Sequence, residues 1–336
     1  MRRALDSETP CKLPFRPLIQ GEPLSSWLIR SALACGCDPL ILCTSIWGAW
    51  RPWTRDIDRS LAQVRIQTLS EASGIDAQRL RASTLQQTLA NLIPSDASFA
   101  GCWPWVVARG SRNRRSHGGF PFCPHCLAQD ARPHLRLSWR LAWHVGCEHH
   151  GICLLDFCAR CGAVVSPQML TASSGDITAC WRCGADLRES RGCTCDPKAL
   201  AAQGLADAVL AGGPGSALPP EMSTSEWFSA VRSVISERWA AITATSGIEP
   251  ASFASGLRFE LQSVCERHLR MRYLQEVIEA RNGDLRGVGV KYVSGVQRKR
   301  RARRGVKRGS PPRPRSKAAV MADWARLLRR MGQGYQ

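Results

Sequence analysis

The chain has 336 residues, of which 44% are hydrophobic, and a formal net charge of +19. This length and hydrophobic content suit two or three small cores, so we expect a multidomain chain. The sequence has no run of about 18 consecutive apolar residues, the length that a membrane span requires, and we expect a soluble protein with no membrane partner.

Cysteine usage indicates a reducing compartment. Sixteen cysteines would suggest disulfides in a secreted protein. However, residues 1–8 are not followed by the apolar segment of a signal peptide. We therefore expect a cytoplasmic protein whose cysteines are thiols or metal ligands.

Positive charge is dense near the end of the chain. Eleven Lys and Arg residues lie between Arg298 and Lys317 without an acidic residue among them, which leaves +8 for the rest. DNA is the expected partner of so basic a chain, although the charge could serve only solubility. The candidate DNA contacts are Arg112, Arg114, Arg115, Arg298, Lys299, Arg300, Arg301, Arg303, Arg304, Lys307 and Arg308.

Two helix pairs are predicted near the beginning of the chain. Between residues 23 and 48, an apolar helical pattern is broken at Gly36, and Asp38 with Pro39 caps and starts the next helix. Gly74 and Asp76 repeat this arrangement between residues 67 and 85. Each pair has a helix-turn-helix outline, which occurs both in DNA-binding proteins and in proteins that do not bind DNA.

Eight candidate zinc ligands form four pairs with two-residue gaps: Cys123 and Cys126, Cys147 and His150, Cys158 and Cys161, Cys180 and Cys183. Such gaps let both side chains face one tetrahedral ion. We predict two structural Zn²⁺ ions, whose four protein ligands leave no position for a substrate. Serial pairing is preferred because each long gap can form its own hairpin, and an interleaved pairing stays open. His149 could replace His150 only with a different gap.

The remaining cysteines near these pairs fit no four-ligand set. They are interpreted as buried small residues or free thiols: Cys35, Cys37, Cys153, Cys193 and Cys195. Redox chemistry is the rival interpretation of any C-x2-C pair, but the sequence offers no βαβ context for it. Phosphate-loop, H-E-x-x-H and G-x-S-x-G motifs are absent from the sequence, so no enzyme is predicted.

Apolar residues at every second position from Leu135 to Val145 predict a strand, and hence a small β-ribbon in the first zinc module. Trp103 and Trp105 are expected in a core. Helices are predicted over 198–211, 225–242 and 257–278, the last with His268 as a core histidine on its apolar seam. The segment 284–316 is predicted to be disordered, and 318–331 to form a terminal amphipathic helix.

The predicted fold is multidomain and mainly α, with small β zinc-ribbon modules. Its parts are a helical domain with helix-turn-helix-like units over 13–110, tandem zinc modules over 118–192, a helical domain over 197–283, and a basic, largely disordered tail with a terminal helix over 284–336.

The combination of motifs resembles the TniQ family of bacterial transposition proteins. The resemblance rests on the G-E-x-L-S-S-W opening within 17–30, on 122–127, on Trp139, and on the cysteine and histidine pairs, and it covers about 13–188. It implies zinc ligation by the eight residues named above and a helix-turn-helix role for 25–47.

The resemblance also implies a non-catalytic accessory protein, associated with the bacterial nucleoid, that takes part in target-site selection. Family members bridge DNA or a targeting complex to an AAA+ ATPase and a separate transposase. The alternatives are a helix-turn-helix transcriptional regulator and an RNA-binding zinc-ribbon protein. The sequence leaves homodimerisation open.

Overall fold

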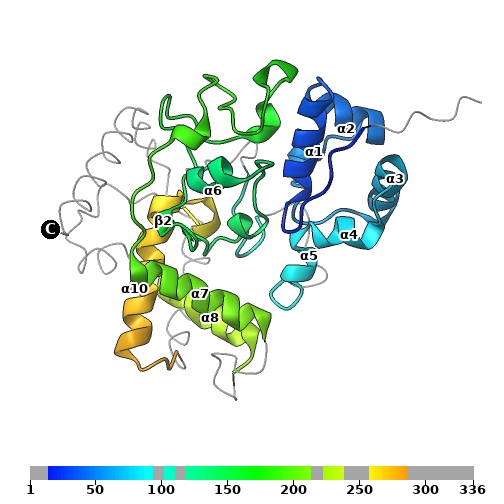
Figure 1. Cartoon of the computed structure of the whole chain (residues 1–336). Coiled ribbons are helices and arrows are strands. Elements are labelled where there is room, and N and C mark those ends of the chain that lie inside the picture. The colour runs from blue at the N-terminus through cyan, green and yellow to red at the C-terminus, as the bar shows by residue number, and fades with distance from the viewer. Residues whose placement is uncertain (1–13, 94–101, 110–117, 213–221, 238–256, 286–336) are drawn as a thin grey trace, which may run out of the picture.

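The computed structural model describes residues 14–93, 102–109, 118–212, 222–237 and 257–285. All eleven basic residues predicted to contact DNA lie outside these ranges, as do the segment 286–316 and the terminal helix predicted over 318–331. Figure 1 shows α1 to α5 on one side of the molecule, α7, α8 and α10 on the other, and the cysteine-rich part between them.

The first part consists of short helices, as the sequence predicts. Its helices are α1 (Leu24–Ala34), α2 (Pro39–Trp47), α3 (Gln63–Ser73), α4 (Ala77–Ala82) and α5 (Leu85–Thr88), with a 3-10 turn at Pro52–Thr54. Gly36 and Gly74 end the first helix of each pair with φ values of +66° and +72°, which a glycine adopts without steric cost. Both predicted turns are therefore confirmed.

The two aspartates at the predicted helix starts behave differently. Asp76 accepts the N–H groups of Gln78 and Arg79 and caps α4. Asp38 occupies the equivalent position before α2, but its carboxylate does not bond to that helix. It accepts the N–H of Ala172 instead, at 2.7 Å, and so connects α2 to the cysteine-rich part.

The cysteine-rich part has little regular secondary structure. Its elements are α6 (Pro124–Gln129), strands β1 (Gly146–Cys147) and β2 (Ile152–Cys153), and 3-10 turns at Ser138–Arg140, Pro167–Met169, Ala172–Ser174 and Leu187–Glu189. Strands β1 and β2 pair antiparallel.

The strand predicted from Leu135 to Val145 is wrong, although the apolar residues of that pattern are buried. The backbone N–H groups of this segment bond to separate parts of the chain. That of Leu137 donates to the Gly21 carbonyl, and that of Ala142 donates to the Trp105 carbonyl. Among the described residues this segment forms an isolated bridge between Leu141 and Val106 but joins no named strand, and it turns through a 3-10 helix at 138–140.

The last described part consists of α7 (Pro197–Ala211), α8 (Thr224–Ile235), a 3-10 turn at Phe259–Leu261, and α10 (Val264–Ala280). Helix α7 agrees with its prediction. Helix α8 ends earlier than predicted, at Ile235, and α10 starts later, at Val264. Ser263 and Glu266 form a capping box there, which satisfies the first N–H groups of α10 and fixes its start.

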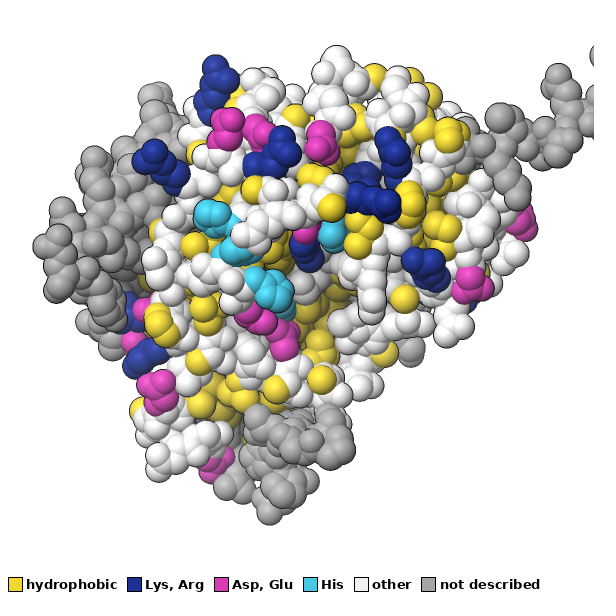
Figure 2. Space-filling model, viewed as in Figure 1, with side chains coloured by type: hydrophobic (Ala, Val, Ile, Leu, Met, Phe, Trp, Pro, Cys, Tyr) yellow, Lys and Arg dark blue, Asp and Glu magenta, His cyan; other side chains and the backbone are white. Residues whose placement is uncertain are grey.

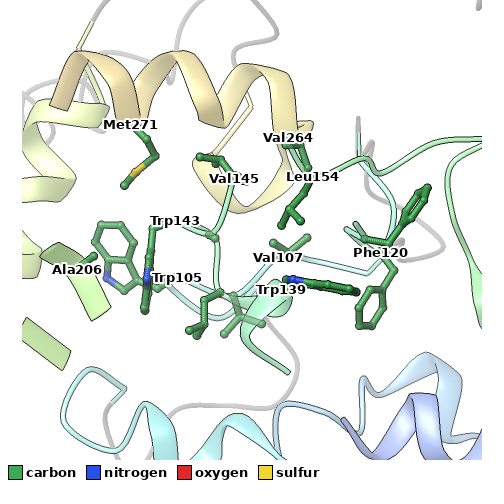
Figure 3. Packing of buried hydrophobic residues seen from close by; sticks show 14 of the residues in the cluster. Trp105, Val107, Phe120, Trp139, Trp143, Val145, Leu154, Ala206, Val264 and Met271 are labelled. Atoms are coloured by element: carbon green, nitrogen blue, oxygen red, sulfur yellow. The ribbon is translucent and has the colours of Figure 1, made fainter. Parts of the chain in front are cut away.

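One hydrophobic core runs from the α1 side through the cysteine-rich part to α10. Trp105 lies within it, with its ring 5.1 Å from that of Phe228 and 6.1 Å from that of Trp143. Figure 3 shows Trp105 and Trp143 below Met271 and beside Ala206. Trp103 and Trp105 are buried, which confirms their predicted place in a core.

Polar side chains of the G-E-x-L-S-S-W opening form hydrogen bonds within the molecule. The fully buried Glu22 accepts hydrogen bonds from the Ser26 hydroxyl at 2.7 Å and from Arg30 at 2.7 and 2.8 Å. The Ser26 hydroxyl also accepts the N–H of Leu135, at 3.1 Å. These side chains therefore hold α1 against the cysteine-rich part.

A buried ionic network joins the same two parts. Arg140, whose side chain is fully buried, donates to Asp56 and Asp58 at 2.7 Å each. Asp58 also accepts the N–H and the hydroxyl of Ser25 at the start of α1. Burial would raise the pKa of Asp56, but the guanidinium groups of Arg140, Arg109 and Arg59 together outweigh this effect and lower the pKa.

Among the described residues no single helix is long and apolar enough to cross a membrane. Helices α1 and α2 meet that criterion of length and composition only when taken together, across a bend of 105°.

We predict that Arg140→Met destabilises the fold by about 3–5 kcal/mol, because it removes the arginine closest to two carboxylates and leaves only the longer ion pairs of Asp58 with Arg109, at 3.3 Å, and of Asp56 with Arg59, at 3.7 Å. Urea unfolding of the metal-loaded protein at pH 7 measures this. Stability contributed by Asp56 is present above about pH 4 and is lost as the pH falls through its lowered folded-state value, so the difference should shrink on acidification.

The matched control is Arg188→Met, which removes an ion pair to Asp186 whose arginine side chain is 41% exposed. It should cost less than about 1 kcal/mol. Equal losses in the two variants would contradict the assignment of a connecting role to Arg140.

Candidate metal centres

The first cluster brings together the four predicted ligands Cys123, Cys126, Cys147 and His150. Cys123 and Cys126 lie at the start of α6, while Cys147 and His150 lie on β1 and in the turn that follows it. The Nδ1 atom of His150 is 3.4 to 3.5 Å from the three sulfur atoms, and the sulfur atoms of Cys126 and Cys147 are 3.5 Å apart.

These separations fit a tetrahedral zinc site. Ligands about 2.3 Å (sulfur) or 2.0 Å (nitrogen) from one ion in a tetrahedron lie about 3.5 to 3.8 Å from one another. Three thiols and one imidazole are also donors that zinc prefers. The cluster could therefore hold a zinc ion with a complete set of protein ligands.

The imidazole of His150 is oriented by a second hydrogen bond. Its Nε2 atom lies 2.9 Å from Oε1 of Gln129, at the end of α6. If Nε2 carries the proton and donates to this oxygen, Nδ1 keeps its lone pair for the cluster. His149 is exposed, so the two-residue gap of the sequence identifies the correct histidine.

The second cluster consists of four cysteines, Cys158, Cys161, Cys180 and Cys183. Sulfur atoms from the two pairs lie 3.7 Å apart, both between Cys158 and Cys183 and between Cys161 and Cys180. A hydrogen bond from the Ala185 backbone lowers the pKa of Cys183 to about 7, which favours the thiolate, the form that binds metal. This cluster also suits one tetrahedral ion.

Three of the four pairs share one backbone turn. Gly151, Gly162 and Gly184 each follow the second residue of a pair and have φ between +62° and +69°. Each donates its N–H to the carbonyl of the first residue of its pair, at 2.8 or 2.9 Å. Glycine adopts this left-handed conformation freely, so the turn that points both ligands the same way is encoded locally.

The structure brings the eight ligands together serially, first pair with second and third with fourth. This agrees with the preferred pairing and excludes the interleaved one. Each long gap closes on its own cluster, through α6 and the β1–β2 hairpin in the first module and through 3-10 turns in the second.

Sequence reasoning missed a third group of donors. Cys153, Cys195 and His268 are buried, and their donor atoms lie within 4.8 Å of one another. The sequence interpretation is that these cysteines fit no four-ligand set, and the structure brings two of them together with His268 in a group of three donors. The local signal was the C-x-C spacing of Cys193 and Cys195, but its partners lie in distant parts of the chain.

The described residues thus form a mainly helical protein built around clusters of cysteine and histidine that could hold metal ions. Residues 14–154, which make up less than half of the chain, match the family model described as TniQ. This family implies a transposition-associated accessory protein. No curated protein matches the chain.

We predict that Cys126→Ser and Cys180→Ser each lower the zinc content of the purified protein by one equivalent, measured by elemental analysis. Small modules of this kind obtain much of their folding free energy from metal binding, about 10–16 kcal/mol in zinc-finger peptides, so each variant should unfold its own module. Limited proteolysis would show cleavage within that module.

The control is Cys43→Ser, which replaces a buried cysteine on α2 that lies outside these clusters. It should leave the zinc content unchanged. Loss of zinc from this variant, or full retention in Cys126→Ser, would contradict the ligand assignment.

Proposed function

We propose that this chain is a non-catalytic zinc-binding accessory protein of DNA transposition that takes part in target-site selection. In this role it bridges DNA, or a complex bound to DNA, to the ATPase and transposase of the element. The family match over 14–154 carries the proposal. The two four-ligand clusters support it, because four protein ligands leave no coordination position for a substrate.

An adaptor must keep its binding surfaces in a fixed relation, and the described contacts suit this requirement. The Glu22 and Ser26 bonds and the Arg140 network fasten α1 to the cysteine-rich part. The polar groups in these contacts form hydrogen bonds and ion pairs with other residues of the same chain. We infer that the family opening serves the internal scaffold and that partners bind elsewhere.

Helix α2 is suited to an apolar partner. Its sequence, PLILCTSIW, contains neither lysine nor arginine. Leu40 and Ile41 on this helix are neighbours that are 51% and 58% exposed, and side chains of this kind suit contact with an apolar surface of another protein. We infer that α2 contacts another protein of the transposition machinery.

The second helix pair is better suited to DNA. Helix α4 carries Gln78, Arg79 and Arg81, and α3 presents the exposed Gln63 and Gln67. Arg79 also donates to the Leu18 carbonyl and Arg81 to Gln63, so DNA would compete with these two bonds. Glutamine and arginine are the side chains that bond to adenine and guanine edges, and arginine also binds phosphates. We therefore assign DNA contact to α3 and α4, whereas the resemblance favoured the first pair.

On one face of the described body (Figure 2), basic side chains do not form a single field. On the face shown in Figure 2, Lys and Arg side chains lie among Asp and Glu side chains. The densest positive charge of the sequence lies between Arg298 and Lys317. We infer that this basic segment supplies most of the sequence-independent affinity for DNA.

Removal of 298–317 from the full chain should weaken binding to nonspecific duplex DNA by at least about tenfold at 50 mM salt and should flatten the salt dependence between 50 and 200 mM. Each phosphate contact that is lost reduces the slope of log K against log salt by about 0.9. Fluorescence anisotropy measures both quantities. An unchanged slope would reject this role for the segment.

A double variant, Gln78→Ala with Arg81→Ala, should weaken duplex binding further when introduced into the chain that lacks 298–317. Base and phosphate contacts of this kind contribute about 1–3 kcal/mol each. The matched double variant Leu40→Ser with Ile41→Ser should bind DNA normally and should lose binding to the partner ATPase in a pull-down. If the Leu40 and Ile41 variant lost DNA binding and the Gln78 and Arg81 variant lost the ATPase, DNA contact would belong to α2 and partner contact to α3 and α4.

A further inference from the structure

We propose that Cys153, Cys193, Cys195 and His268 form a third zinc site, which fastens helix α10 to the β1–β2 hairpin. Sulfur and imidazole donors from Cys153, Cys195 and His268 lie within 4.8 Å of one another, close enough to share one ion. All three residues are at least 96% buried. A buried set of soft donors at this spacing is the composition of a structural zinc site.

We assign Cys193 as the fourth donor, although its sulfur lies outside the group of three donors within 4.8 Å of one another. Its side chain lies beside the Cys153 side chain and interacts with it. The backbone fixes this arrangement, because the N–H of Cys153 donates to the carbonyl of Cys193 at 2.8 Å. The N–H of Cys195 likewise donates to the Gly151 carbonyl at 2.8 Å, so the C-x-C segment lies along the hairpin. With Cys193 added to the group of Cys153, Cys195 and His268, three thiols and one imidazole would repeat the donor set of the first cluster.

The β1–β2 hairpin separates this site from the first cluster. Gly146 pairs with Cys153, and Cys147 pairs with Ile152. Paired residues share a face of the hairpin and successive residues alternate between faces. Cys147 therefore faces the first cluster, while Cys153 faces the opposite side.

Gly146 shows how closely the third set packs. A Cβ atom at this position would lie 2.6 Å from the sulfur of Cys195. Because Gly146 has no side chain, the space next to its Cα is free for the Cys195 sulfur, which lies there close to Cys153. A residue with a side chain there would push this sulfur out of the donor set.

Helix α10 presents His268 in a fixed position. The neighbouring Arg267 is fully buried and donates to the carbonyls of Ala142 and His144, which precede the hairpin. The Nε2 atom of His268 accepts the N–H of Asp196 at 3.1 Å. The ring therefore carries a lone pair directed at the residue after Cys195. An ion bound at that lone pair would replace the Asp196 hydrogen bond.

Zinc is the ion that this donor set fits best. Thiolates exclude magnesium and calcium, which prefer oxygen ligands. A complete set of four protein ligands marks a structural site. Cys193, Cys195 and His268 lie beyond the segment 14–154 that matches the family model, so this site would attach the following helices to the family region.

Native mass spectrometry of the full chain, purified with zinc under reducing conditions, counts the bound ions. We expect three zinc ions in the unsubstituted protein, and two in Cys195→Ser and in Cys193→Ser. A count of two in the unsubstituted protein, or a disulfide between Cys153 and Cys195 in its intact mass, would overturn the proposal. Three ions in Cys193→Ser would remove Cys193 from the ligand set.

Substitutions at His268 separate ligation from packing. His268→Gln keeps a hydrogen-bond acceptor for Asp196 but should lose the third ion, whereas His268→Cys should retain it. The matched control Cys265→Ser changes a buried residue on the same helix, outside the donor set, and should retain three ions. Three ions in His268→Gln would show that the histidine only packs, and would reject the site.

Discussion

The convergence of cysteine and histidine side chains determines the shape of the middle of this protein. Between residues 118 and 195 the chain has one short helix, two strands of two residues and single 3-10 turns. So little regular structure leaves few backbone ladders to offset the entropy of ordering the segment. Donor clusters that bring distant residues within 4 Å supply the missing constraint, and bound zinc would turn each of them into a firm cross-link.

The two helical parts depend on this middle segment from opposite sides. Arg140 and the N–H of Leu135 hold α1 through Asp58 and Ser26. On the far side, Arg267 holds α10 through backbone carbonyls. Because buried charges are costly to leave unpaired, these contacts specify one arrangement of the parts rather than several. A chain built this way is suited to present separate partners at a fixed spacing.

Local chemistry could be predicted from the sequence, and remote partnerships could not. The eight ligands follow from two-residue gaps, and three pairs are marked further by the glycine that follows them. The turns at Gly36 and Gly74 were equally readable. The strand predicted from Leu135 to Val145 is wrong because the alternation of apolar and polar residues there reflects burial alone. The N–H groups of this segment donate to acceptors in distant loops and not to a neighbouring strand. Ser263 and Glu266 form a capping box that fixes the start of α10 at Val264. The apolar pattern begins earlier, at Leu257, and therefore predicts too early a start.

The Asp38 carboxylate does not cap its own helix, and it accepts a hydrogen bond from the N–H of Ala172 instead. Its carboxylate therefore connects the exposed helix α2 to the loop between the two cysteine pairs of the second cluster. A molecule that binds Leu40 and Ile41 would contact the same helix that this hydrogen bond joins to the loop. The exposed face of α2 and the second cluster are thus joined by one hydrogen bond and by the loop between Cys161 and Cys180 that carries Ala172.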